Sequence, residues 1–478
     1  MTCCYNSYFL VVWSSVALAL PVGVGLVASS FVRLWTDDNA SRLPAFGLFC
    51  LGLLPLLWTA YMRRHAPRLK VRAGAWPSLG CGDAYPRNAR ELEAAVKAIR
   101  EKYKRNPEIV GAAWGHFITR RGAAGPRIYT HRMLGRDRTA NRLKEDQSKK
   151  EEYWHCGNTI RYMVQHFSHS NLTFSTHPTM DYISIGAWFA MGNHGNGGNH
   201  ESTKGSSDTL QSARVLNMNT QQTLYMNYKQ LRQAFDTSPR DYCVISVAFK
   251  EDNLSYNSVV QKRGIVVNSI QSASDWLAKG AHLRVLFQGA ARDYAIGLRW
   301  EGEYDEKFCQ SHRDPHLCSR FCLYAQLDLC SVWGGWHESM HKFRGCSTHA
   351  DANRWMPLLF PIETVFTVAM GYYNFEIIFK LNNGALNGLV LFQLTRSLIR
   401  MHEAHGGRSE IRYGAEDKDE PIFLDVVLRR SADFSAPFRM LEHEFEVTQV
   451  ALHPGKYRPA STAPCKRVTL FDMYYNQS

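Results

Sequence analysis

The stretch THPTMDYISIGAWFAMGNHGNGG, Thr176 to Gly198, joins an apolar run to a cluster of glycines. Glycine permits positive φ and has no Cβ, so successive backbone N–H groups can turn toward an anion such as a phosphate. The order G-x-x-G-x-G-G differs from the Rossmann fingerprint G-x-G-x-x-G, which joins a strand directly to a helix. Apolar residues before the glycines favour a buried turn over the alternative, a glycine-rich surface loop. The stretch therefore predicts a phosphate-binding turn of another kind. Its glycines are Gly186, Gly192, Gly195, Gly197 and Gly198.

The composition is that of a folded protein with a basic surplus. The 478 residues suffice for one large two-part domain or for two to three smaller ones. The net charge of +13 suits nucleic acid, anionic lipid or an anionic cofactor. Because neither a basic helix nor an RNA-binding aromatic pattern is present, nucleic acid is not expected as a partner. A cytosolic domain would keep most of the 12 cysteines reduced, and the group from Cys309 to Cys346 leaves zinc, disulfides or separate thiols open.

Two uncharged hydrophobic stretches, about 8–32 and 43–62, predict transmembrane helices, because each is about long enough to cross a bilayer. A basic run from Arg63 to Arg72 follows the second stretch, and the positive-inside rule puts it in the cytosol. Residues 1–72 are therefore expected to be a multi-pass membrane anchor in contact with lipid, with the body on the cytosolic side. The endoplasmic reticulum is favoured, and a mitochondrial membrane is the alternative. The other readings are a signal peptide and a buried core helix.

The body reads as alternating helices and short strands. Asn88 and Glu91 have capping-box spacing, and apolar residues then repeat at helical intervals to Tyr103. Further elements are expected as a strand at 107–114, a helix at 159–167, strands within 212–227 and at 242–249, and short strands around 410–428.

Several motifs, taken in order, resemble one family. They are P-x-x-x-x-E-L-x-x-A-V at 86–96, W-G-H at 114–116 and I-S-I-G-A-W-x-A-M-G-N-H-G-N-G at 183–197. This order resembles the FAD-binding domain of the vanillyl-alcohol oxidase and p-cresol methylhydroxylase superfamily. Downstream, E-I-R at 410–412 resembles the E-x-R signature of aldonolactone and alditol oxidases, and H-P-G-K at 453–456 resembles their H-W-G-K. The resemblance spans most of residues 80–460 and is weak between about 257 and 350.

The resemblance implies an α+β fold with an FAD-binding domain of two subdomains at 80–256 and a substrate or cap domain at 257–478. It implies FAD as cofactor, held by glycine-rich backbone. His116 stands where many members attach FAD covalently, although Phe117 replaces the usual serine, and it could instead only pack in the turn. His194 is expected to fix the loop. The implied cofactor-binding residues are Trp114, Gly115, His116, Ser184, Gly186, Gly192, Asn193, His194, Gly195, Asn196, Gly197, Gly198 and Ile245.

The resemblance also implies hydride removal from a hydroxyl-bearing carbon of a sugar lactone or polyol, with oxygen or a cytochrome as electron acceptor. Glu410 would accept hydrogen bonds from substrate hydroxyls, and Arg412 would stabilise the developing alkoxide. On a strand, the two side chains would share one face. Lys456 would offset negative charge on the reduced flavin. Ala187 and Pro454 depart from the family pattern, and an isolated E-x-R is more often a surface ion pair.

Three other functions stay open. A membrane FAD-dependent sterol or lipid oxidoreductase would use the same fold with the anchor. A zinc metalloprotease is indicated by His337, Glu338 and His341, which form H-E-x-x-H, although the preceding WGGW is a poor helix start and no clear third ligand follows. A flavoprotein fold that has lost its activity could serve as a membrane scaffold.

Overall fold

The computed structural model describes most of the body and none of the predicted anchor. All described residues belong to one of the chain's two compact units, which comprises 82–357 and 371–478. The expected spans at 8–32 and 43–62 lie outside the described residues. Among the residues that are described, no helix has the length and apolar character needed to cross a membrane. The described residues are 84–111, 126–140, 151–174, 178, 183–193, 209–250, 254–256, 259–278, 283–288, 295–301, 344–348, 372–382, 386–413 and 421–475.

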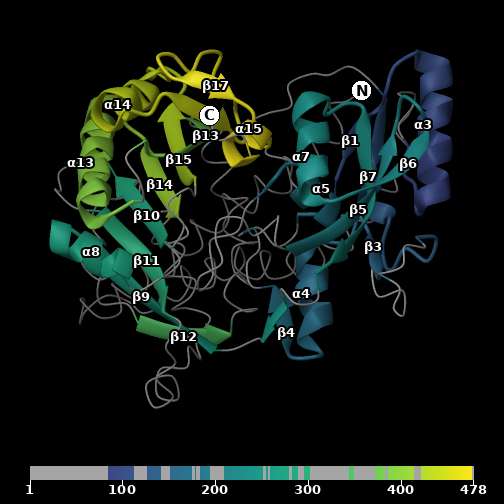
Figure 1. Ribbon diagram of the computed structural model, residues 1–478, viewed down its shortest axis with the longest axis horizontal. Coiled ribbons are helices and arrows are strands. Elements are labelled where there is room, and N and C mark those ends of the chain that lie inside the picture. Colours follow the sequence, from purple (N-terminus) through teal and green to yellow (C-terminus); the bar gives the residue numbers. More distant parts are fainter. Residues whose placement is uncertain are drawn as a thin grey trace, which may run out of the picture. The chain divides into compact units, whose positions relative to one another are not determined.

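The described part of the body mixes helices and strands, as expected for an α+β protein (Figure 1). Its first half supplies α3 (Ala89–Tyr103), β1 (Glu108–Val110), β2 (Arg127–Tyr129), β3 (Tyr153–His155), α4 (Ile160–Ser168), β4 (Leu172–Phe174), α5 (Ile185–Ala190), β5 (Leu210–Asn217), β6 (Gln222–Met226), α7 (Tyr228–Thr237), β7 (Tyr242–Phe249) and β8 (Leu254–Tyr256).

Its second half supplies β9 (Val259–Val267), α8 (Ile270–Ala278), β10 (Leu283–Gln288), β11 (Ala295–Glu301), β12 (Arg344–Thr348), β13 (Tyr372–Phe379), α13 (Gly388–His405), β14 (Arg408–Tyr413), β15 (Ile422–Arg429), α14 (Ala436–Phe445), β16 (Gln449–Leu452), β17 (Lys466–Val468) and α15 (Leu470–Tyr475).

Local capping places the early helices where the sequence predicts them. The Asn88 side chain accepts a hydrogen bond from the Glu91 N–H, 3.0 Å away, at the start of α3. The Thr159 hydroxyl caps α4 in the same way, through the Tyr162 N–H at 3.2 Å. Both helices bury their apolar residues in one core with β5 and β7. The expected strands at 212–227 and 242–249 are also confirmed, as β5, β6 and β7.

Strands up to residue 256 form small sheets, and those from residue 259 onward form a large one. Among the described strands, β3, β7, β5 and β6 make a four-stranded antiparallel sheet in that order. The larger sheet has the order β12-β9-β11-β10-β14-β15-β13-β16-β17 and is antiparallel except for β16 with β17. Helices α8, α13 and α14 lie along one face of it (Figure 1), and their apolar residues join alternate residues of its strands in a second core.

The opposite face of the large sheet carries a different set of residues. Ile378 and Phe423 on this face form a small apolar cluster with Leu470 and Met473 of α15. The α15 segment also reaches α7, because the Phe471 N–H donates to Asp236 Oδ2 at 2.7 Å. Helix α15 therefore contacts both the large sheet and helix α7.

Candidate functional site

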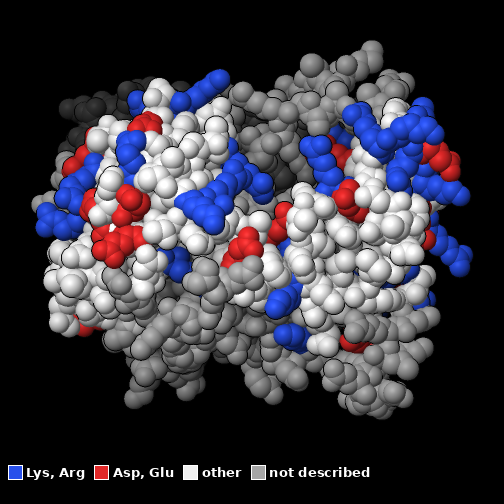
Figure 2. Space-filling view, turned by 45° about the horizontal axis from the view of Figure 1, so that its top comes forward, with Lys and Arg blue, Asp and Glu red and all other residues white. Residues whose placement is uncertain are grey.

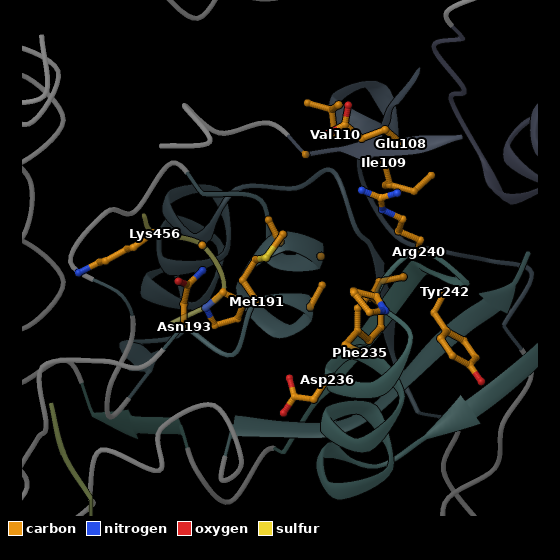
Figure 3. Close-up of a pocket in the computed structure, with 18 of the residues that line it drawn as sticks. Glu108, Ile109, Val110, Met191, Asn193, Phe235, Asp236, Arg240, Tyr242 and Lys456 are labelled. Atoms are coloured by element: carbon orange, nitrogen blue, oxygen red, sulfur yellow. The ribbon is translucent and has the colours of Figure 1, made fainter. Parts of the chain in front are cut away.

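A cavity of about 1350 Å³ lies in the body. It is larger than the roughly 300–1,000 Å³ that holds a drug-sized ligand, so it has room for a dinucleotide. Lining residues come from β1, from α5, from the end of α7 with the start of β7, and from the loop after β16. In Figure 3 Lys456 and Arg240 lie on opposite sides of this cavity, with Met191 between them.

The α5 side of the cavity depends on small residues. Gly186, Ala187 and Ala190 line the cavity from α5. A Cβ added to Gly186 would meet the Cys156 Cβ at 2.6 Å, so only glycine lets the helix approach Cys156, the residue after β3, this closely. The Gly186 N–H donates to the Cys156 carbonyl at 3.0 Å, which fixes the contact. Burial raises the pKa of the Cys156 thiol to about 12, so this residue acts as a neutral packing group.

The glycines of this stretch act differently from the prediction. The segment Ile185–Ala190 is a helix, capped by the Ser184 hydroxyl, and Gly186 has ordinary helical backbone rather than positive φ. Its absent side chain is needed for packing instead. Gly192, just after the helix, has φ of +60°, and a Cβ there would clash with the buried guanidinium of Arg232. The positive φ expected at these glycines is therefore found at Gly192 and not at Gly186.

Asn193 is the last described residue of this turn. Its carbonyl accepts a hydrogen bond from Trp188 Nε1 at 3.0 Å, and its N–H donates to the Trp188 carbonyl at 3.1 Å. The Trp188 ring is fully buried against Phe189 and Phe174. The apolar core thus anchors the chain at the point where Asn193 meets the cavity.

The sheet side of the cavity is built around a buried charge cluster. Lys456 Nζ lies 2.6 Å from Glu376 Oε2 and 2.6 Å from Asp425 Oδ2. The three side chains are 9%, 1% and 10% exposed in that order. Buried charges are tolerated when they are paired and hydrogen-bonded, which these are. We call these three residues the charge triad.

The H-P-G-K loop owes its shape to the edge of β13. The His453 N–H donates to the Glu376 carbonyl at 3.1 Å, and the Tyr457 N–H donates to the Asn374 carbonyl at 3.0 Å. Between them, His453 Nδ1 accepts a hydrogen bond from the Gly455 N–H at 3.0 Å. The loop therefore continues the pairing with β13 and brings Lys456 to the cavity wall.

Cations outnumber acids around the cavity. The acids Glu108 and Asp236 are engaged, since Glu108 pairs with Arg127 at 3.0 Å and Asp236 accepts from the Phe471 N–H. Burial and nearby Arg467 lower the pKa of Arg458, while Asp236 acts in the opposite direction. On the face that Figure 2 shows, the described Lys and Arg side chains gather in larger groups than the described Asp and Glu side chains. Such a lining favours an anionic ligand. The cations are Arg105, Arg240, Arg430, Lys456, Arg458 and Arg467.

The structure brings several of the sequence-predicted residues to this cavity. Gly186, Asn193 and Lys456 line it, and Gly192 lies between the first two in the sequence. Ser184 caps α5, and its hydroxyl packs against Gly111. Ile245 is buried in β7, where its carbonyl accepts from the Cys156 N–H, while its neighbour Val244 lines the cavity.

Other predicted residues are described in part or not at all. Glu410 and Arg412 lie on β14, in register with Asp425 and Phe423 of β15, but their side chains are outside the described part. Metal-binding groups of three or more His, Cys, Asp or Glu are absent from the described residues. The predicted site residues that lie wholly outside the described part are Trp114, Gly115, His116, His194, Gly195, Asn196, Gly197, Gly198, His337, Glu338 and His341.

Sequence reasoning missed Glu376 and Asp425. Each is a single acid inside an apolar strand, in YYNFEIIF and IFLDVVLR. An acid at such a position is informative, because a buried carboxylate requires a partner. That signal could have marked both residues as part of a polar site.

No family model matches this sequence, and no curated protein is detectably similar to it. Among solved structures it is similar to Phl p 4, a grass pollen allergen with glucose dehydrogenase activity, at 11% identity and a TM-score of 0.49, covering 80% of this chain and 81% of that chain. It is also similar to wild-type Phl p 4.0202, a glucose dehydrogenase, at 12% identity and a TM-score of 0.49, covering 80% of this chain and 81% of that chain. A third similar structure is the Bermuda grass isoallergen BG60, at 11% identity and a TM-score of 0.47, covering 78% of this chain and 79% of that chain.

Proposed function

We propose that this protein is an FAD-dependent oxidoreductase that oxidises a CH–OH group of a sugar lactone or polyol. One observation carries the proposal: two motifs far apart in the sequence, around Gly186 and around Lys456, line one large cavity. In sequence, both motifs resemble the same flavoprotein superfamily. Their meeting at one cavity is what a shared cofactor site requires.

The residues present suit FAD on three counts. The cavity has room for a dinucleotide, its lining is rich in cations, and Cβ atoms at Gly186 and Gly192 would disturb the wall. Gly186, Ala187 and Asn193 would hold the cofactor on one side, and cations such as Arg240 would balance its phosphates. When bound, FAD supplies an acceptor for a hydride.

The remaining chemistry falls to the chain's own side chains. Glu410 would accept hydrogen bonds from the substrate hydroxyls, and Arg412 would stabilise negative charge on the reacting oxygen. Lys456, paired with two carboxylates, would add a positive charge at the cavity wall. We propose oxygen or a cytochrome as the final electron acceptor.

The test begins with the absorption spectrum of the full chain purified in detergent, before and after acid precipitation. A flavin spectrum in the supernatant supports noncovalent FAD, and one in the pellet supports attachment through His116. Glu410→Gln and Arg412→Gln should then each lower turnover of lactones and polyols by at least about 100-fold while FAD stays bound. If the purified chain is folded but colourless even with added FAD, the proposal that FAD is the cofactor is contradicted. Unchanged turnover in both variants contradicts the substrate.

A second candidate keeps the flavin and changes the substrate to a sterol or another lipid. Its support is an aromatic group on the sheet side of the cavity, where Tyr373 stacks on Tyr457 at 4.4 Å and Phe434 lies 5.5 Å from Tyr457. Aromatic faces suit an apolar ring better than a polyol. Turnover of sterols in vesicles, with none of lactones or polyols, would favour this candidate.

The membrane anchor belongs to the same proposal. Two uncharged stretches and the basic run after them support a hairpin in the endoplasmic reticulum membrane with the body in the cytosol. Carbonate extraction should leave the chain in the membrane fraction, and protease added outside sealed microsomes should digest the body. A body protected from that protease contradicts the orientation.

A further inference from the structure

Two buried charged residues of α7 lie behind the α5 side of the cavity. Arg232 and Asp236 are one helical turn apart, and their side chains are 0% and 9% exposed. Arg232 Nη2 lies 3.8 Å from Asp236 Oδ1 and donates a hydrogen bond to the Ala190 carbonyl at 2.7 Å. Ala190 is the last residue of α5, where carbonyl groups need partners outside the helix. Arg232 therefore ties α7 to the end of α5.

The same guanidinium lies against the glycine turn, residues 191–193, which follows α5. A Cβ at Gly192 would clash with Arg232 Nη1 and would lie 3.2 Å from Leu470 Cδ1. Met191 and Asn193, on either side of Gly192, line the cavity, and so does Leu470. Arg232 is not among the described lining residues, so it supports this part of the cavity wall from behind.

Asp236 extends these contacts to the C-terminal helix. Its Oδ2 accepts a hydrogen bond from the Phe471 N–H at 2.7 Å, in the first turn of α15. Asp236 and Leu470 both line the cavity, so this first turn is itself part of the cavity wall. The contacts thus run without a break from Ala190 through Arg232 and Asp236 to Phe471. We call these four residues the α5–α15 connection.

Helix α15 depends on tertiary contacts for its stability. It has six residues, whereas an isolated helix needs roughly 12–15 to be even marginally stable in water. Leu470 and Met473 attach it to the large sheet by packing with Ile378 and Phe423. Short elements near a chain end open at lower free energy than the cores to which they are attached. A change in these contacts is therefore expected to act on α15 before it acts on either core.

Stability alone does not explain an arginine at position 232. In the part of the chain that the structure describes, Nε and Nη1 of Arg232 have no hydrogen-bond partner. Burial of unfilled donors costs stability, and an apolar side chain of similar length would fill the space without that cost. The arginine contributes what an apolar residue could not, a bond to Ala190 and a pairing with Asp236.

We infer that α15 is a clasp on the cavity, and that Arg232 and Asp236 are the positioning residues through which it fixes the glycine turn. With α15 docked, Leu470 completes the wall beside Gly192, and the α5–α15 connection holds the turn. When α15 detaches, Asp236 loses the Phe471 N–H and Leu470 leaves the wall, so the cavity opens and its ligand can leave. The inference rests on the proposed function for the identity of that ligand, FAD.

Hydrogen exchange followed by mass spectrometry tests the coupling without any cofactor, on the full chain in detergent. Asp236→Ala removes the acceptor of the Phe471 N–H and should speed exchange by about tenfold or more, both in α15 and in the peptide that contains the glycine turn. Asp236→Asn keeps an oxygen acceptor and should restore most of the protection. Asp433→Ala, which removes an exposed carboxylate, should leave both peptides unchanged.

A chain that ends at Thr469 separates the clasp from the direct effect of Asp236. It lacks α15 and keeps Arg232 and Asp236, and its glycine turn should exchange faster, as in Asp236→Ala. Unchanged exchange of the turn in this shortened chain would overturn the inference, and so would faster exchange confined to α15 in Asp236→Ala. If Asp236→Ala does not fold, the shortened chain decides.

Release of flavin measures the consequence for the ligand. After dilution into FAD-free buffer, free-flavin fluorescence should rise about tenfold faster for Asp236→Ala and for the shortened chain than for the unaltered chain or Asp433→Ala. Where the flavin is attached covalently, iodide quenching of its fluorescence replaces release and should increase in the same two chains. Equal values in all four chains would overturn the inference. A full chain that takes up no flavin contradicts the proposed function instead, and hydrogen exchange alone then decides whether α15 is coupled to the turn.

Discussion

On the α5 side of the cavity, small residues let backbone and side chains approach closely, whereas on the sheet side a buried cation is held by two carboxylates. On the α5 side, the absence of a Cβ at Gly186 and Gly192 makes room for neighbouring atoms. The sheet side pairs one buried cation with two carboxylates. Substitutions on the two sides should therefore destabilise the protein for different reasons. A larger residue on the α5 side causes steric overlap, whereas a neutral residue on the sheet side removes an ion-pair partner.

The largest effect is expected from removing the cation of the charge triad. Lys456→Met should lower the free energy of unfolding by about 3–5 kcal/mol, because it removes a cation that is paired with two buried carboxylates. Urea unfolding monitored by circular dichroism measures this. The triple variant Lys456→Met, Glu376→Gln, Asp425→Asn should recover part of the loss, since it neutralises the two carboxylates together with the lysine.

An exposed ion pair of the same region is the matched control. Arg439 and Asp433 lie 2.5 Å apart with side chains 46% and 43% exposed. Arg439→Gln should cost only about 0–1 kcal/mol, because solvent screens the pair. Equal losses in Lys456→Met and Arg439→Gln would refute the contrast between a buried and an exposed charge.

The second effect is a loss of stability at acid pH, caused by the buried His402 on helix α13. Burial lowers the pKa of His402 on α13 to about 4, and its ring bonds the Gly406 carbonyl and the Ser409 hydroxyl. The imidazole of His402 takes up a proton near pH 6.5 in the unfolded chain and only near pH 4 in the folded chain. Above pH 6.5 this histidine is neutral in both states and does not lower the free energy of unfolding. That free energy should then fall by roughly 3 kcal/mol as the pH drops to 4.

Urea midpoints at pH 7.5, 5.5 and 4.5 measure this slope. His402→Gln should flatten it, whereas His443→Gln, at an exposed position, should leave it unchanged. The slope should not vanish, because burial and nearby Arg132 also lower the pKa of His131, in the first half of the chain, to about 4. An identical slope in His402→Gln would show that this histidine does not titrate as described.

The smallest effect is expected on the α5 side. Gly186→Ala should lower the free energy of unfolding by about 1–2 kcal/mol, because overlap with Cys156 outweighs the helix propensity gained by alanine. Urea unfolding measures the loss. In a Cys156→Gly background the same change should cost much less, and an equal cost in both backgrounds would rule out this contact as the cause.

Local signals were enough for many elements of the fold. The caps at Asn88 and Thr159 and the apolar periodicity behind them predicted α3 and α4. The strand YCVISVAF was predicted with its observed bounds. Such elements depend on neighbours within one or two turns, so the sequence contains the necessary information. The helix Ile185–Ala190 was missed because its glycine looked like a turn residue, while its actual role depends on Cys156 of a distant segment.

By itself, the sequence determined the order of the motifs, the capped helices and the alternating strands, and its resemblance to a family pointed to Lys456, which lines the cavity. Only the tertiary structure decided which residues surround Lys456. Glu376 and Asp425 are far from it in the sequence and meet it through the register of β13, β15 and β16. Strand register is set by the packing of whole sheets against their helices, so no local pattern contains it.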